Sequence, residues 1–514
     1  MGFFDVNVAI GRFAGGGEAF EDVAQLEGEL SRLGIDGALV HHATAAEADV
    51  QLGNALLSRD LAAHRNLHAC WVMVPPYFDD VPKPRDWVRN ARDAGVKAVR
   101  VFPRHHLFEF REWCVGELCG YLEASALPLL IDFGPRHWSE SVISWNGIRE
   151  VARAHPALPI ILTGANVGDV RKLPVLLREL PNFYAEIHAF NPPDAIEQFV
   201  EAGLGERLLF GTGLPKCAAE CVVGQMRATN ISDKVFSAIS NGTAAKLFGL
   251  DAVSAGRTDR KLTDGCEIID VHAHIGSWER TTTPLKGPEA FFKSMDRCGI
   301  DKMVFSSFTA IHGETRVGNA ETAEAITEGQ GRLFGYAVVN PNYPKESIED
   351  LTRLFAQSAE FVGLKLHCQL HGAQLHDAGY AECLSFADAH ELPVLVHGGG
   401  QDEWDAVALR YPGANFIMAH ACAWDGRSAS GKALYERVRH TSNLYVDVSG
   451  SAAHRNAMFA LIDLVGAERI LYGSDFPMFD LGFEVGRVTL STIPDAQKEL
   501  ILATNARRIF KRLR

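Results

Sequence analysis

Residues 268–276 read IIDVHAHIG, and residues 3–11 read FFDVNVAIG. The two stretches align at an offset of 265 residues (268 − 3), and most of their apolar residues coincide. The polar positions differ, because His272 and His274 of the later copy are replaced by Asn7 and Ala9 in the earlier copy. One chain therefore carries two versions of the same segment, and only one version keeps the histidines.

The similarity continues along the whole chain. Three further pairs of blocks occur in the same order: LGIDGALVHHATA (33–45) with CGIDKMVFSSFTA (298–310), LPLLIDFG (127–134) with LPVLVHGG (392–399), and GERLLFGTGLP (205–215) with AERILYGSDFP (467–477). Chance similarity between apolar strands does not produce many blocks in one order, so we interpret the chain as an internal duplication.

The repeated blocks predict the fold. Most are short runs of Val, Ile and Leu, which are typical of buried parallel strands. Amphipathic stretches such as 18–34 and 288–299 lie between them and end at glycine, as helices do. About eight strand–helix units per half, and a half-length close to the roughly 250 residues of a barrel, predict an α/β fold of two tandem (β/α)₈ TIM-like barrels. We place the domains at 1–255 and 262–514, with the polar segment 251–265 between them.

Composition narrows the classes of partner. The formal net charge is −14, whereas a nucleic-acid-binding surface needs a basic patch. No window approaches eighteen consecutive apolar residues, so we expect no membrane span. The ten cysteines form no CxxC pair, and the N-terminus lacks a secretory signal. We expect a cytoplasmic protein that binds a small molecule, with neither nucleic acid nor membrane as a partner.

The histidines of the second half point to a metal ion. Residues i and i+2 of a strand face the same side, so His272 and His274 direct two imidazoles to one point at the barrel mouth. Three more polar residues follow buried strands: His397, His420 and Asp475. Imidazole and carboxylate are ligands of Zn²⁺ and related ions, and a catalytic ion needs three or four of them. A single histidine is usually structural, but four histidines and one aspartate at the ends of four strands of one barrel favour a metal site.

These motifs resemble the amidohydrolase superfamily, in its amidohydrolase-related branch, which contains aminocarboxymuconate semialdehyde decarboxylase. The resemblance covers nearly all of 266–514, and 1–250 as a degenerate copy. It implies one divalent metal ion, zinc with manganese or another ion as alternatives, held by His272, His274, His397 and Asp475. It also implies that His420 activates water beside the ion, or becomes a ligand in a site with two metals.

Four other residues are expected to contribute to the pocket of the second half. Lys365 and His367 are again i and i+2 and should face the barrel mouth. For Lys365 we weigh a clamp on a substrate carboxylate, a carbamylated bridge between metals as in some family members, and a salt bridge within the barrel. Trp278 and Arg280 follow the HAHIG segment, where they either shape the pocket or are plain loop residues.

The first half has lost the corresponding residues. Its five matching positions are Asn7, Ala9, Asp132, Gly164 and Gly213. Only Asp132 is a strong metal ligand, and a single carboxylate does not make a metal site. Because the strand hydrophobics remain while the ligands are gone, we predict a pseudo-enzyme barrel kept for its shape.

Three functions fit this sequence. The first is metal-dependent hydrolysis of a small carboxylic ester, lactone or amide through an activated water, with His420 or Asp475 as general base. The alternative is non-oxidative decarboxylation of an aromatic or unsaturated acid, in which the same two residues handle a proton. The third is a binding protein without catalysis, which the intact ligand set of the second half disfavours.

A duplicated barrel also raises the question of assembly. Duplication of a symmetric homodimer is the simplest origin, because a two-fold interface pairs the same patch of both copies. We therefore expect the two barrels to pack as an intramolecular pseudo-dimer, with further homo-oligomers possible.

Overall fold

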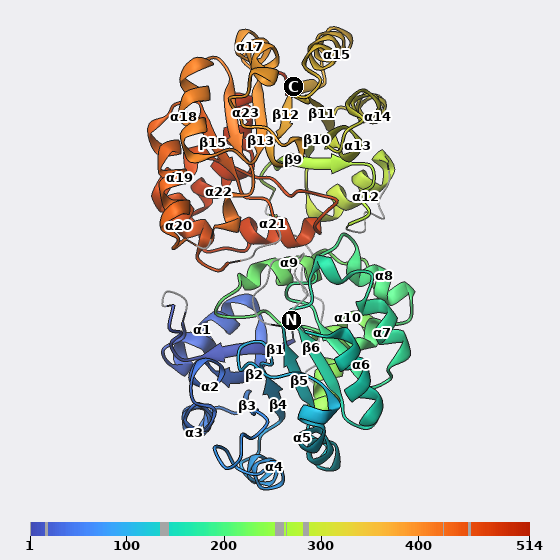
Figure 1. Cartoon of the computed structure of the whole chain (residues 1–514), viewed down its shortest axis with the longest axis vertical. Coiled ribbons are helices and arrows are strands. Elements are labelled where there is room, and N and C mark those ends of the chain that lie inside the picture. Colours follow the sequence, from blue (N-terminus) through green and yellow to red (C-terminus); the bar gives the residue numbers. More distant parts are fainter. Residues whose placement is uncertain are drawn as a thin grey trace. The chain divides into compact units, whose positions relative to one another are not determined.

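A computed structural model describes the chain at residues 2–15, 19–133, 143–251, 262–263, 265–280, 287–424, 426–450 and 454–513. It divides into two compact units, Met1–Arg260 and Lys261–Arg514, coloured blue to green and yellow to red in Figure 1. Most of the segment 251–265, in which we expected the boundary, lies outside the described residues.

The first unit contains one sheet of eight parallel strands in sequential order. Its strands are β1 (Phe3–Ile10), β2 (Ile35–His42), β3 (Leu67–Val72), β4 (Ala98–Val101), β5 (Leu129–Asp132), β6 (Ile160–Thr163), β7 (Phe183–Glu186) and β8 (Leu208–Leu209). Their side chains are almost all buried, as the continuous apolar runs predict for strands covered on both faces.

The second unit repeats this arrangement, again with eight parallel strands in order. They are β9 (Ile269–Ile275), β10 (Lys302–Ser307), β11 (Leu333–Val338), β12 (Phe361–His367), β13 (Pro393–His397), β14 (Asn415–Met418), β15 (Leu444–Asp447) and β16 (Ile470–Leu471). Two tandem (β/α)₈ barrels, as the repeat predicts, are therefore confirmed.

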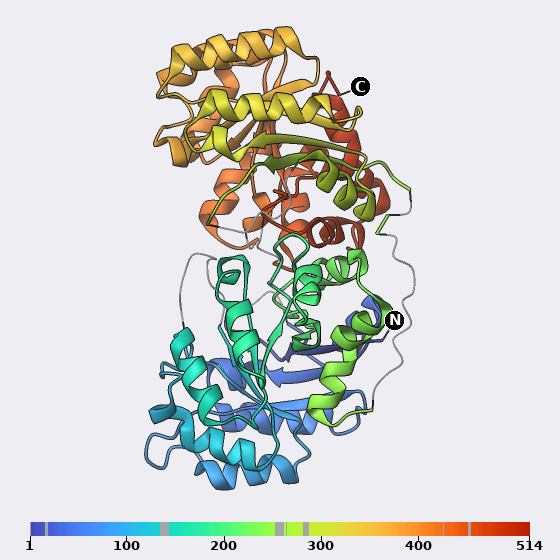
Figure 2. The same ribbon diagram turned by 90° about the vertical axis from the view of Figure 1, so that its right-hand side faces the viewer.

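Helices surround the strands of each unit (Figures 1 and 2). Those of the first are α1 (Val23–Leu33), α2 (Ala43–Glu47), α3 (Val50–Leu61), α4 (Pro84–Asp93), α5 (Glu112–Ala124), α6 (Trp145–Ala154), α7 (Leu173–Glu179), α8 (Ala195–Glu201), α9 (Ala219–Ala228), α10 (Asp233–Ser237) and α11 (Thr243–Phe248). Those of the second are α12 (Pro288–Cys298), α13 (Phe308–Ile311), α14 (Thr315–Thr327), α15 (Pro344–Gln357), α16 (Cys368–His371), α17 (Ala381–Ala389), α18 (Gln401–Arg410), α19 (Ala429–His440), α20 (Ala457–Val465), α21 (Leu481–Thr489), α22 (Asp495–Glu499) and α23 (Asn505–Ile509).

The first predicted helix begins later than its amphipathic pattern. We expected a helix over 18–34, but α1 starts at Val23 because the side chain of Asp22 accepts a hydrogen bond from the backbone N–H of Gln25. Its end is as predicted, since the chain leaves the helix at Gly34 with φ of 74°.

Each barrel is closed by a buried aspartate of its first strand. Asp5 accepts hydrogen bonds from the backbone N–H and the hydroxyl of Thr212, at 3.0 and 2.5 Å. Asp270 accepts the same two bonds from Ser474, at 3.1 and 2.5 Å. The first strand is thereby joined to the segment that follows the eighth. This shared contact shows that the duplication extends to buried polar interactions.

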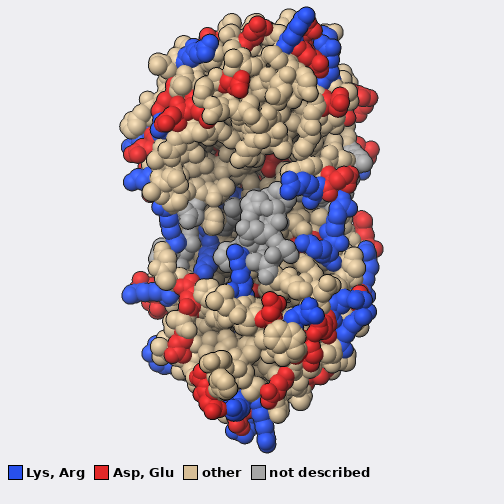
Figure 3. All heavy atoms as spheres, viewed as in Figure 1, with Lys and Arg blue, Asp and Glu red and all other residues tan. Residues whose placement is uncertain are grey.

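The charged residues lie mainly outside these cores. Figure 3 shows Lys and Arg interspersed with Asp and Glu on the face of each unit that it presents. Among the described residues, no helix is both long and apolar enough to cross a membrane.

Candidate metal centre

The two histidines of the HAH segment lie at the carboxyl end of β9 and are buried. The Nε2 atom of His274 is 3.0 Å from Oδ1 of Asp475, and Nε2 of His272 is 3.5 Å from the same oxygen. Because side chains alternate along a strand, both imidazoles face the same side, as the spacing predicts. They meet one carboxylate, that of Asp475, which follows the last strand of the barrel.

His420 lies in the same group. Ligand atoms of His272, His420 and Asp475 all lie within 4.8 Å of one another. Atoms bound to one ion at about 2.0–2.3 Å are roughly 3–4.6 Å apart, so this group needs little movement to bind one divalent metal ion. The donor set, two imidazoles and a carboxylate with a third imidazole beside them, fits such an ion.

The other two predicted histidines, His397 and His367, lie next to this group and extend the cluster of imidazoles. Nδ1 of His397 is 3.0 Å from Nε2 of His420. The ring of His367 stacks on that of His397, with centroids 4.0 Å apart. His397 is therefore adjacent to the three-residue group, and its role as a ligand stays a prediction.

Lys365 is fully buried at the end of β12, and its Nζ lies 2.8 Å from Nε2 of His272. Burial lowers the pKa of this ammonium group to about 8, although the carboxylates of Asp475 and Asp447 raise it. The lysine thus places a positive charge among the candidate ligands, as its position in the sequence predicts.

The two loop residues lie at the edge of this cluster. The ring of Trp278 is 6.0 Å from that of Phe308 and 5.1 Å from that of His312. Phe308 in turn stacks on His274, with centroids 4.6 Å apart. Trp278 is half-buried in this aromatic group, whereas Arg280 is exposed and covers the ring of Trp278 at 5.8 Å.

Sequence reasoning missed three buried residues that position the histidines. Oδ2 of Asp447, at the end of β15, is 2.9 Å from Nδ1 of His272, so Nε2 of this ring faces the site. Ser449 contacts His272 and His420 at their Nδ1 atoms, at 3.1 and 2.9 Å, and Ser306 contacts Nδ1 of His274 at 3.1 Å. The repeat held a signal for Asp447, because the first copy has an acidic residue, Glu186, at the same position.

Burial favours the neutral form of four of these imidazoles, and the neutral form is the one that binds metal. It lowers the pKa of His274 to about 3 and that of His367 to about 2, and in His274 the charge of Asp475 opposes this effect. The pKa values of His397 and His420 are also lowered by burial. The pKa of Asp475 lies below its usual range, because the neighbouring histidines outweigh the effect of burial on its carboxylate.

Two site residues have an unusual backbone. His420 and Asp475 adopt left-handed conformations, with φ of 65° and 60°. At the matching positions the first barrel has Gly164 and Gly213, with φ of 80° and 70°. The fold thus requires positive φ at both places, and a side chain is present only where it serves the candidate site.

The first barrel fills the corresponding space with another network. Arg100, at the position of Lys365, is buried and donates to Oδ1 of Asn7 at 2.7 Å. Its guanidinium also contacts Nδ1 of His41 at 2.9 Å, and it lies 3.6 Å from Asp132. The carboxylate that we singled out as the last strong ligand is therefore beside a cation.

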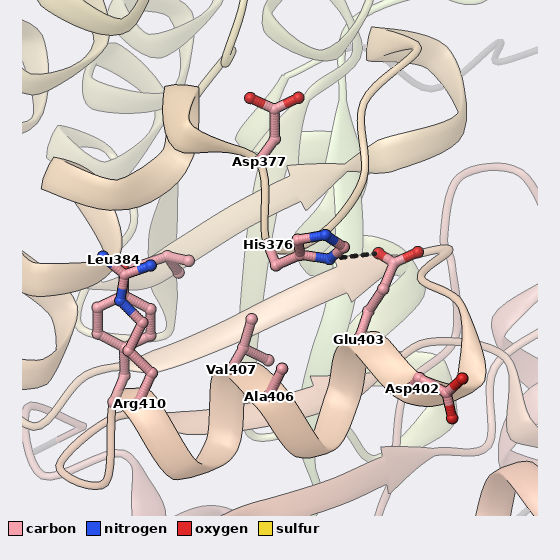
Figure 4. Close-up of a pocket in the computed structure, with 9 residues that line it drawn as sticks. His376, Asp377, Leu384, Asp402, Glu403, Ala406, Val407 and Arg410 are labelled. Atoms are coloured by element: carbon pink, nitrogen blue, oxygen red, sulfur yellow. Dashed lines mark ion pairs between the residues drawn. The ribbon is translucent and has the colours of Figure 1, made fainter.

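A separate pocket of about 300 Å³ lies at α17 and α18 of the second unit (Figure 4). Its walls include Leu384, Val407 and Tyr411, and an ion pair joins His376 to Glu403 across 3.9 Å. None of the metal-site residues lines it, so it is not the candidate centre.

Comparison with known proteins places these observations in a family. The sequence profile of the family described as Amidohydrolase matches residues 11–250 and again 269–512. Among curated proteins, none matches the chain.

Several solved structures are similar to about half of the chain. The 2,6-dihydroxybenzoate decarboxylase from Rhizobium is 18% identical, covers 48% of this chain and 99% of its own, and has a TM-score of 0.39. The 5-carboxyvanillate decarboxylase from Sphingomonas paucimobilis has 14% identity, the same coverage and a TM-score of 0.37. That from Novosphingobium aromaticivorans, solved with manganese, has 16% identity, covers 48% and 96%, and has a TM-score of 0.39.

The family match spans both barrels, and the second barrel holds a histidine and aspartate group whose donor set suits a divalent ion. The chain therefore belongs to the amidohydrolase family and carries that family's domain twice.

Proposed function

We propose that the second barrel is a divalent-metal-dependent decarboxylase of a small aromatic or unsaturated carboxylic acid. The observation that carries the proposal is the buried ammonium group of Lys365, 2.8 Å from His272 within the ligand set. A fixed cation beside a metal site binds an anionic group of the substrate by a charge-assisted hydrogen bond. The carboxylate of the substrate is the group that suits it.

The aromatic residues favour a planar substrate. Phe308 stacks on His274, and Trp278 and His312 adjoin it. Aromatic side chains stack on flat unsaturated groups with offset or edge-to-face geometry. These three rings would hold a planar acid beside the metal ligands.

Decarboxylation then needs a proton at the carbon that carries the carboxylate. We propose that His420 or Asp475 handles this proton, since both belong to the group beside Lys365. Once the carbon is protonated, the bond to the carboxyl carbon breaks, its electron pair stays with the substrate, and CO₂ leaves. Ser449, which contacts Nδ1 of His420 at 2.9 Å, fixes the orientation of this ring.

The resident ion that we propose is zinc, with manganese as the alternative, held by His272, His274, His397 and Asp475. When bound, the ion would polarise the oxygen atoms of the substrate. Histidine and carboxylate ligands suit either metal.

Hydrolysis of an ester, lactone or amide is the second candidate. His420 favours it, because a neutral imidazole within the ligand group is the usual general base for water. Both reactions use the same residues, so their products decide between them.

The test is a panel of hydroxybenzoic and unsaturated acids, labelled with ¹³C in the carboxyl group, incubated with the metal-loaded full-length protein in D₂O. We expect ¹³CO₂ release and one deuterium at the carbon that carried the carboxylate. A parallel panel of lactones and amides is incubated with the same protein in H₂¹⁸O. Unchanged acids, together with lactones or amides that take up ¹⁸O, would instead establish the hydrolase.

A variant tests the role of the lysine. Lys365→Gln should raise KM for the acid by at least about tenfold, since a hydrogen bond to a charged group contributes about 1.5–3 kcal/mol. Lys293→Gln is the matched control, because Lys293 is exposed on α12 and pairs only with Glu289 among the contacts described. An unchanged KM in Lys365→Gln would exclude the carboxylate clamp.

A further inference from the structure

The first barrel has a thiol, an imidazole and a carboxylate close together at its strand ends. Glu186 is the last residue of β7 and is fully buried, and its Oε2 lies 2.5 Å from Nδ1 of His188. Sγ of Cys217, in the segment after β8, and Nε2 of His188 lie 3.1 and 3.2 Å from the point where a Cβ atom on Gly213 would stand, so the thiol and the imidazole are neighbours. Both His188 and Cys217 are partly exposed, so a small molecule can reach them.

The lost metal ligand leaves the space for this group. Gly213 occupies the position of Asp475, and a Cβ atom there would lie 2.9 Å from Cδ2 of His188 and 3.1 Å from Sγ of Cys217. Any side chain at residue 213 would therefore collide with the imidazole and the thiol. The position that carries a metal ligand in one barrel is empty in the other, and a cysteine and a histidine surround it.

The carboxylate of Glu186 and the imidazole of His188 also stand at positions that match site residues of the second barrel. Asn7, at the position of His272, contacts Oε2 of Glu186 at 3.1 Å and Nδ1 of His188 at 3.2 Å. Its own amide oxygen accepts a hydrogen bond from Arg100. His188 stands where the second barrel has Ser449, and Glu186 where it has Asp447. The substitutions form one connected network around the imidazole.

The network has the organisation of an activated cysteine. A cysteine nucleophile needs a base within hydrogen-bond reach and a third group that orients the base. Glu186 fixes one ring nitrogen of His188, which leaves the other for the thiol. Burial lowers the pKa of His188, but the charge of Glu186 and the hydrogen bond to Cys217 outweigh it and raise the pKa well above its ordinary value. A protonated imidazole stabilises a neighbouring thiolate.

We propose that the first barrel carries a nucleophilic thiol site, in which His188, oriented by Glu186, takes the proton of Cys217 while the sulfur attacks small activated acyl compounds. In the first step Sγ of Cys217 attacks the carbonyl carbon of an ester, a C–S bond forms and the C–O bond breaks. The leaving alkoxide takes the proton of His188. Water then attacks the thioester while His188 accepts a proton, and the acid and the thiolate are released.

The first measurement uses the unmodified full-length protein. Iodoacetamide at pH 6.5 alkylates a thiolate and displaces iodide, and labelling of each cysteine is followed by peptide mass spectrometry. Cys114 is the control, because it is also half-buried in the first barrel and burial raises its pKa. We expect Cys217 to react at least about tenfold faster, since an ordinary thiol is only roughly 1% ionised at that pH. Equal rates for the two residues would overturn the proposal.

Two further experiments separate the imidazole from mere exposure of the thiol. His188→Gln should reduce the rate of Cys217 to that of Cys114 and leave Cys114 unchanged, whereas an unchanged rate at Cys217 would overturn the role of His188. In the His420→Ala background, where the second barrel is silenced, p-nitrophenyl acetate should leave an acetyl group on Cys217 after acid quench. A protein without that adduct would exclude acyl transfer at this site.

Discussion

His420 and Asp475 show how the candidate site is built at the level of single residues. Each adopts a left-handed backbone conformation that costs a residue other than glycine about 1–2 kcal/mol. The first barrel has glycine at both positions. Keeping a histidine and an aspartate there costs stability, which is consistent with their placement in a functional site.

This cost can be measured at His420. We expect the unfolding free energy of His420→Gly to exceed that of His420→Ala by about 1 kcal/mol. Both variants lack the imidazole, but only alanine is strained by a positive φ. For a barrel of this size the midpoint of thermal unfolding should differ by about 2–4 °C. Phe459, which is exposed within α20, is the matched control. There Phe459→Gly should be less stable than Phe459→Ala, because glycine is the poorer helix former. An alanine variant as stable as the glycine variant at residue 420 would contradict the account.

The roles of the two histidines can also be separated. We expect His420→Ala to keep most of the bound metal while turnover falls at least about 100-fold, as removal of a general acid or base does. His272→Ala should lose the metal itself. Metal content by mass spectrometry and turnover are measured on the same samples. If His420→Ala is as depleted of metal as His272→Ala, His420 is a ligand.

At the level of elements, a buried aspartate paired with a hydroxyl joins the first strand of each barrel to the segment after the eighth, and the burial of this aspartate makes stability depend on pH. Burial raises the pKa of Asp5 from 3.8 to about 6, although the hydrogen bonds from Thr212 oppose this. Because the folded state prefers the protonated acid, the contribution of Asp5 is most favourable below the unfolded pKa. It becomes unfavourable as pH rises towards 6, by up to about 3 kcal/mol.

Asp5→Asn removes this titration. The unfolding free energy of the variant minus that of the wild type should increase between pH 4 and pH 6 and stay constant above that range. Denaturant unfolding at several pH values measures it, with Asp36→Asn, at an exposed position of β2, as the control. A difference that does not change with pH, or that falls, would contradict the assignment.

The elements also show how far the sequence can be read. The apolar blocks and their order predict both barrels, because buried parallel strands need continuous apolar residues whatever their function. The HAH spacing predicts that His272 and His274 converge, because strand geometry is regular. Asp447 was missed, since it acts by contacting His272, which is 175 residues away in the sequence. Likewise, the start of α1 depends on the Asp22 cap rather than on apolar periodicity.

At the scale of the whole molecule, duplication with divergence explains why one barrel kept its ligands and the other did not. We propose that the two copies support each other as an intramolecular pseudo-dimer. Tethering gives each copy a local concentration of roughly millimolar for the other, so a modest interface is enough. The thiol group of the first barrel adds a second reason for its retention.

The pseudo-dimer predicts the behaviour of the second barrel alone. A 260–514 fragment should be insoluble, self-associated or nearly inactive, because it would lack the partner surface that the proposed pseudo-dimer supplies. Light scattering and turnover of the fragment, compared with the full chain, measure this. A monomeric fragment with full activity would show that the first barrel does not support the second.

The central claim is that one metal centre, in the second barrel, is built by the HAH segment and Asp475. The most direct test is the divalent metal content of three full-length proteins: the wild type, the His272→Ala/His274→Ala double variant, and a control in which Asp132 of the first barrel is replaced, Asp132→Ala. We predict one ion per chain in the wild type and in Asp132→Ala, and none in the double variant. A double variant that still holds one ion per chain, or an Asp132→Ala protein that has lost it, would contradict the account.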